Sequence, residues 1–225
     1  MIDLEKFKIT DIDGKVYCGG NQYWILDGGG ALCGTTTAAN IFAYILRFNS
    51  QLLEASGVRI PLDTKDGFIE FIEYAKETVF PRKTEFGLMA HRMFEGLPAF
   101  AERLMVPVTC TAADRLDVPS GDLGDSVYDA FFAEAKAFIQ EGLSRNIPIA
   151  FLNLSPLGFL SPKNIDGEIE RWHWVTIVGV DETAPLKVHV VDNNNECWAD
   201  LTAWAREKKS HGSFVRLSWF DTNQK

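Results

Sequence analysis

The chain lacks the features that mark a membrane or exported protein. It has no stretch of about 20 apolar residues, the length that a membrane-spanning helix needs. Its first residues show no basic segment followed by an apolar one, and the initial Met1 is a further reason to expect no trimmed signal peptide. Internal repeats and low-complexity segments are missing as well. We therefore expect a cytoplasmic protein with no membrane partner.

Basic residues are scarce. The chain has 22 Lys and Arg against 31 Asp and Glu, a formal net charge of -9. The densest basic cluster is the short run Arg-Glu-Lys-Lys at residues 206–209. A nucleic-acid-binding protein normally carries a basic patch, so we expect no nucleic acid partner.

Cysteines are few and widely spaced. The four are Cys18, Cys33, Cys110 and Cys197, and no Cys-x-x-Cys or zinc-ribbon spacing occurs among them. A chain of 225 residues can bury a core without disulfides or a structural metal. We expect free thiols, no metal site and no cofactor.

The hydrophobic pattern predicts an α+β fold. Apolar residues at three- and four-residue spacing predict helices, and β-rich apolar runs predict strands. The expected helices are 33–57, 65–79, 88–104 with an interruption at Pro98, 127–143 and 201–208, and the expected strands are 15–18, 106–111, 147–154, 172–180, 188–192 and 214–219. One domain, 1–225, follows: a mainly helical lobe (about 1–146) packed on a mainly antiparallel sheet or half-barrel (about 147–225). A cleft between two such lobes is a favoured place for a site.

Cys33 stands where the first long helix is expected to begin, after the glycines 28–30. The unpaired N–H groups and positive dipole of a helix start favour a reactive thiolate and can bind a developing oxyanion. Gly30 and Gly34 are expected to leave room for a substrate backbone. The alternative interpretation is a small buried cysteine in a tight glycine turn.

His173 begins an expected apolar strand, and Asp192 and Asn193 end the strand that should pair with it. A hairpin would bring either Asp192 or Asn193 close to His173, which gives a nucleophile, a base and a group that orients the base. Strand alternation favours Asp192 and turns His189 away. The alternative is a histidine that caps a core strand beside an Asn-rich turn.

Four stretches together resemble papain-like cysteine peptidases, in particular the bacterial branch that includes bacteriocin-leader peptidases. They are Gly-Gly-Asn-Gln-Tyr-Trp at 19–24, Cys-Gly-Thr-Thr-Thr-Ala-Ala-Asn-Ile at 33–41, His-Trp-Val-Thr-Ile-Val-Gly-Val-Asp at 173–181 and Val-Val-Asp at 190–192. Residues 51–146 match nothing in that family.

The resemblance implies a papain-like fold and hydrolysis of an amide bond, with a peptide or other amide as substrate. It implies that Cys33 is the nucleophile, His173 its base and Asp192 the orienting group, while Gln22 and the Cys33 N–H bind the oxyanion. Asn193 and Asn21 are the alternates for the last two roles. We expect the cleft to be lined by Gly30, Gly34, Trp24, Trp172 and Trp174.

Two positions depart from the family pattern. Thr35 stands where the branch often has Pro, and Asp27 stands about six residues before the cysteine, where the oxyanion Gln is usual. Gln22 lies 11 residues upstream of Cys33, which we interpret as an insertion of the glycine run. The alternatives left open are Cys18 as nucleophile, a metal held by the same three side chains, acyl transfer of the transglutaminase or arylamine acetyltransferase type, and an inactive binding domain. The sequence leaves the substrate and the oligomeric state open.

Overall fold

The computed structural model describes residues 2–25, 31–80, 87–121, 123–154, 172–183, 186–206 and 211–220. Within these ranges the chain is a mixed α+β protein with six α-helices, and all of its paired strands run antiparallel. No helix in these ranges is long and apolar enough to span a membrane.

The helices largely follow the predicted pattern. They are α1 (Cys33–Phe48), α2 (Ser50–Ser56), α3 (Lys65–Thr78), α4 (Ala90–Arg103), α5 (Asp125–Ser144) and α6 (Leu201–Arg206), with short 3-10 helices η1 (Leu4–Phe7), η2 (Gln22–Trp24) and η4 (Ala112–Asp114). Every residue of α1 from Cys33 to Leu46 is buried. This helix is therefore the centre of the helical part, where the small side chains of Ala38, Ala39 and Ala43 let neighbours approach closely.

Two helix predictions need correction. The single helix expected over 33–57 is two helices, because Asn49 has a non-helical φ of -125° and its side chain accepts bonds from the N–H groups of Gln51 and Leu52. Such a side-chain cap begins a new helix. Pro98 does not interrupt α4. Proline removes one helix hydrogen bond, and the buried Met93 and Leu97 on the same helix hold it in place.

The strands form one large sheet and two small ones. The large sheet has the order β4 (Arg115–Asp117), β9 (Gly212–Val215), β5 (Ile149–Asn153), β6 (His173–Val180), β7 (Lys187–Asp192) and β8 (Asn195–Asp200). The small sheets pair β1 (Lys8–Thr10) with β2 (Val16–Cys18), and β10 (Ser218–Trp219) with β3 (Val108–Thr109).

Two strand predictions need correction, and one strand was not predicted. The expected strand 214–219 is β9 and β10, which belong to different sheets. The expected strand 106–111 is only the two residues of β3. No strand was expected after Asp192, yet Asn193 and Asn194 adopt φ of 41° and 66° and the chain returns at once as β8. Positive φ at two successive residues is the geometry of a tight two-residue hairpin turn.

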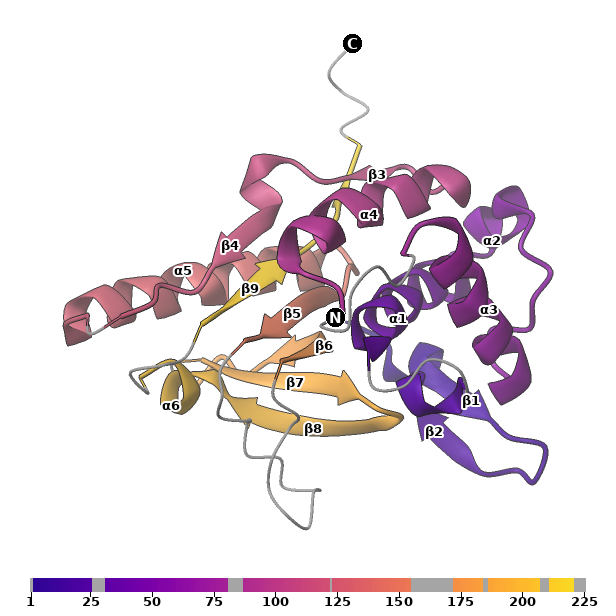
Figure 1. Cartoon of the computed structure of the whole chain (residues 1–225), viewed down its shortest axis with the longest axis horizontal. Coiled ribbons are helices and arrows are strands. Elements are labelled where there is room, and N and C mark those ends of the chain that lie inside the picture. The colour runs from indigo at the N-terminus through magenta and orange to yellow at the C-terminus, as the bar shows by residue number, and fades with distance from the viewer. Residues whose placement is uncertain are drawn as a thin grey trace.

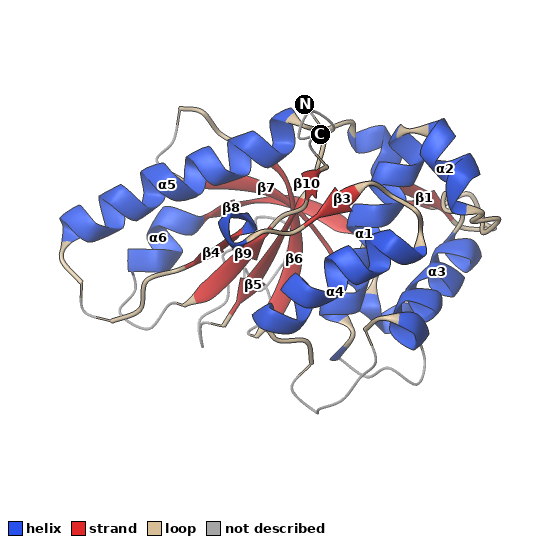
Figure 2. Cartoon of the chain, turned by 90° about the horizontal axis from the view of Figure 1, so that it is seen from above, coloured by secondary structure: helices blue, strands red, loops and turns tan. Residues whose placement is uncertain are grey.

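Helices cover both faces of the large sheet. Successive residues of a strand point to opposite faces of the sheet. Trp174 and Thr176 of β6 contact the helical part that contains α1, whereas Phe151 of β5 packs on Trp204 of α6. Figure 1 shows α1 to α4 gathered on one side, and Figure 2 shows α5 and α6 on the opposite side of the strands from α1 and α4.

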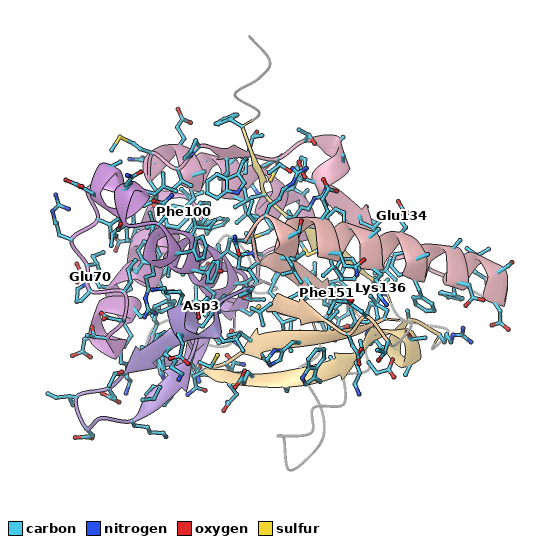
Figure 3. All side chains as sticks on the ribbon, turned by 180° about the vertical axis from the view of Figure 1, so that it is seen from behind. Asp3, Glu70, Phe100, Glu134, Lys136 and Phe151 are labelled. Carbon is cyan, nitrogen blue, oxygen red and sulfur yellow. The ribbon has the colours of Figure 1, made fainter. Side chains whose placement is uncertain are left out.

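One hydrophobic cluster runs through both parts of the chain. Figure 3 shows Phe100 among the helices and Phe151 on the sheet, with Glu70 and Glu134 at the outer edges. The large sheet also takes one strand, β4, from the mainly helical first part. The core is therefore continuous between the helices and the strands.

Candidate functional site

Cys33 is the first residue of α1. Leu32 precedes it without a side-chain cap, and the first turn contains no acidic residue. The positive end of this helix is therefore not offset by a carboxylate, so it remains available to a negative group. The thiol is buried and hydrogen-bonds to His173.

His173 lies between Cys33 and Asp192. Its Nε2 is 2.6 Å from Oδ1 of Asp192. The imidazole is only 2% exposed. Burial by itself lowers the pKa of His173, but the charge and hydrogen bond of Asp192 and the contact with Cys33 outweigh it and raise this pKa well above 6.5. The arrangement therefore favours an imidazolium next to the cysteine sulfur.

Strand pairing brings Asp192 to the histidine. In the β6–β7 hairpin Thr176 is opposite Val191, and the register shifts between Ile177 and Gly179. The turn residue Asn193 follows, and its backbone carbonyl accepts bonds from the side chains of Asn21 and Asn195. Of the two candidates for the orienting group, Asp192 is thus the one that contacts His173.

Gln22 is in η2, completely buried. Asn21 begins this short helix, and its Nδ2 lies 3.4 Å from the Asn193 carbonyl and 3.2 Å from Oδ1 of Asn194. The segment that carries Gln22 is therefore fixed to the β7–β8 turn, directly beside Asp192. Asn21 is engaged in these bonds, so it serves as a structural tie.

Two of the residues expected to line the cleft, Gly34 and Trp174, are buried. The space beside Gly34 is filled, because a Cβ there would lie 2.7 Å from Cβ of Leu88 and 3.1 Å from Cδ1 of Trp174. Trp174 is buried and donates its indole N–H to the Leu88 carbonyl at 2.5 Å. Side chains from the segment before α4 and from β6 therefore occupy the room that was expected beside Gly34.

The other two tryptophans are more open. Trp172 is 57% exposed, has a φ of 56° and meets His211 edge-on at 6.2 Å. Trp24 is partly buried and packs edge-on against Tyr17, with Lys65 5.8 Å from its ring. Of these, Trp172 directly precedes His173 and is the more exposed. Gly30 and Asp27 lie outside the described residues.

A stripe of polar residues on α1, which the sequence analysis overlooked, continues from Cys33 into the core. Thr36, Thr37 and Asn40 line a small cavity of about 10 Å³ together with Cys33, Trp174, Val191, Asn193 and the His173–Asp192 pair. The Thr36 hydroxyl is buried and has no hydrogen-bond partner among the described residues. Such a space is about the size of one water molecule. The signal was present in the sequence, since these positions follow Cys33 at helical spacing on an otherwise apolar helix.

The rival cysteines and histidine lie in other surroundings. Cys18 ends β2, and Cys197 is buried in β8 opposite Val190. Burial raises the pKa of Cys110 to about 12, which keeps it a thiol. His189 stacks on Trp198 at 4.9 Å and pairs with Glu196. In the described ranges, no three side chains of His, Cys, Asp or Glu are grouped to hold a metal ion.

A larger cavity of about 310 Å³ lies between the end of α3 and α4. Leu88 lines it, and so do Val79, Phe80 and Arg92. Among the described residues, this cavity and the small cavity beside Cys33 share no lining residue. Its size alone therefore does not make it the place where chemistry occurs.

Comparison of the chain with protein-family models, with curated proteins and with solved structures finds no match.

Proposed function

We propose that this protein is a cysteine hydrolase with a papain-like fold that cleaves an amide bond, in a peptide or a similar substrate. The observation that supports the proposal is the chain of contacts from Cys33 at the start of α1, through His173, to Asp192. A nucleophile, a base and a group that orients the base recur in this order on unrelated folds.

In the proposed reaction the Cys33 thiolate attacks the substrate carbonyl carbon. The negative charge that develops on the carbonyl oxygen is bound by the Cys33 backbone N–H and the Gln22 side-chain amide. The imidazolium of His173 donates its proton to the leaving amine as the C–N bond breaks, which leaves a thioester on Cys33. His173 then takes a proton from water, whose oxygen attacks the thioester, and the acid product and the thiolate are released. No cofactor takes part.

Cys33→Ala tests the proposal. The change removes the sulfur and little packing, so we expect the protein to lose labelling at this position by a thiol-reactive peptide probe while it melts within a few degrees of the wild type. Loss of a nucleophile typically lowers the rate by several orders of magnitude. Cys18→Ala is the matched control and should label like the wild type.

Three results would count against the proposal. Labelling of the Cys33→Ala protein at Cys18 with the wild-type rate would make Cys18 the nucleophile. A much lower melting temperature would make Cys33 a packing residue. An amide adduct formed in preference to the acid when an amine is added would favour acyl transfer over hydrolysis.

A further inference from the structure

Asn40 connects three parts of the candidate site. It lies on α1 seven residues after Cys33 and is 3% exposed. Its Oδ1 accepts a hydrogen bond from the backbone N–H of Gly20 at 2.8 Å, and its Nδ2 donates to Oγ1 of Thr176 at 3.4 Å. One side chain thus joins the helix of Cys33, the segment that carries Gln22 and the strand that His173 begins.

The bond from Gly20 depends on close contact between these parts. Gly19 has a φ of 73°, and a side chain there would collide with Val191 and lie 3.1 Å from Oδ1 of Asn40. The ring of Phe68 fills the space beside Gly20. The Gly20 N–H donates to Asn40 in a buried hydrogen bond, so removing the Asn40 amide would leave a buried donor without this partner.

The same segment is held from its other side by the β7–β8 turn. The Gly20 carbonyl accepts a bond from the Asn194 N–H at 3.0 Å, and the Asn21 side chain reaches the same turn. Asn40 is the attachment of Gly20 to α1. Without it, the segment would keep its bonds to the turn and the bond from the Gly19 N–H to the Phe7 carbonyl, but it would lose its hydrogen bond to the helix that begins at Cys33.

We infer that Asn40 is a positioning residue that sets where the Gln22 amide stands relative to Cys33. The inference rests on the proposed function, in which Gln22 binds the oxyanion. Asn40 acts through Gly20 and Gln22 and leaves the Cys33–His173 contact to other residues, because Asp192 holds the imidazole independently.

Two reagents separate this role from general support of the fold. Iodoacetamide alkylates a thiolate at a saturated carbon and forms no oxyanion. With 4-nitrophenyl acetate the thiolate attacks a carbonyl, passes through an oxyanion, forms an acetyl thioester and releases 4-nitrophenolate. The ratio of the two rates at Cys33 therefore reports oxyanion binding, corrected for thiolate reactivity.

We expect Asn40→Ala to slow acetylation of Cys33 about tenfold or more, while the alkylation rate and its pH profile stay within about twofold of the wild type. Gln22→Ala should slow acetylation about a hundredfold, and the double variant should be no slower than Gln22→Ala alone, because residues that act through one another are not additive. Thr176→Val, which keeps the Gly20 bond, is the matched control and should change acetylation by less than Asn40→Ala does. If Asn40→Ala does not fold, Asn40→Leu replaces it, since leucine is similar in size to asparagine and offers no acceptor to the Gly20 N–H.

Each other outcome has a separate meaning. Equal losses in both rates would make Asn40 a support of Cys33, and unchanged acetylation or an additive double variant would remove it from the oxyanion site. Either result overturns this inference and leaves the proposed function standing. If wild-type Cys33 reacts with both reagents no faster than a free thiol, the proposed function fails, and the inference fails with it.

Discussion

At the scale of single residues, His173 is the group whose protonation matters most to the proposed function. Its folded-state pKa is raised well above 6.5, mainly through Asp192, in spite of burial. A raised pKa contributes stability that is present below the unfolded value, about 6.5, and is lost as pH rises through the folded value. The pair therefore contributes its full stability at mildly acidic pH, below about 6.5, and the contribution declines from neutral pH upward.

Asp192→Asn tests this account of His173. Without the negative charge, burial dominates, and we expect the pKa of His173 to fall below its wild-type value, with loss of about a thousandfold or more in any turnover. An NMR titration of the four histidines measures the midpoint directly. Glu196→Gln, which makes the same change beside His189, is the control and should leave the midpoint of His173 in place. An unchanged His173 midpoint in the Asp192→Asn protein would contradict the account.

The candidate site was predictable from sequence only where local patterns place a residue at an element's end. Cys33 at a helix start, His173 at a strand start and Asp192 at a strand end are such positions. The contacts of Leu88 and Asn40 were not predictable, because they join elements far apart in the chain, although the place of Asn40 on the Cys33 face of the helix follows from its spacing. The filled space beside Gly34 was missed for the same reason, because no residue near Gly34 in the sequence indicates that Leu88 lies there.

At the scale of elements, a buried ion pair joins both parts of the chain. Arg216, between β9 and β10, is 7% exposed, and its Nε is 3.0 Å from Oδ1 of Asp114, which is 1% exposed. Burial by itself raises the pKa of Asp114, but bonds from Ser218, Thr111 and Arg216 outweigh it, and the net pKa is lowered. A lowered pKa contributes stability above the unfolded value of about 3.9, which is lost as pH falls through the folded value.

Arg216→Leu should lower the free energy of unfolding by about 3–5 kcal/mol at neutral pH, because it leaves the Asp114 charge buried without its partner. In Asp114→Asn, the loss of wild-type stability on going to about pH 3 should be smaller. Urea denaturation at the two pH values measures both. Arg115→Leu breaks an exposed pair with Asp117 and is the control, with an expected change below about 1 kcal/mol. An Arg216→Leu protein as stable as this control would contradict the prediction.

The long helices were predictable because their apolar periodicity extends over many residues, and α3 and α5 match the expected ranges within two residues at each end. β8 was missed because it follows two asparagines, and consecutive asparagines are typical of loops. The break at Asn49 was missed because apolar spacing continues across it into α2. In both cases one or two backbone positions change the chain's direction, while the hydrophobic pattern gives no sign of it.

At the scale of the whole molecule, the helical and strand-rich parts share one core. The strand pair β3–β10, the entry of β4 into the large sheet and the Asp114–Arg216 pair all connect the two. We expect a single cooperative transition, with far-UV circular dichroism and tryptophan fluorescence coinciding and calorimetric and van't Hoff enthalpies equal. Two separate transitions would show that the parts are independent domains.

The most direct test of the central claim is the rate at which each cysteine of the native protein is alkylated by iodoacetamide, resolved by mass spectrometry. At about pH 6 an ordinary thiol, with a pKa near 8.5, is almost entirely protonated and reacts slowly. The account predicts that Cys33, beside the His173 imidazolium, reacts at least about tenfold faster than Cys18 at this pH, and that His173→Ala removes the difference. A Cys33 that reacts no faster than Cys18 at any pH, or equally fast without His173, would contradict it.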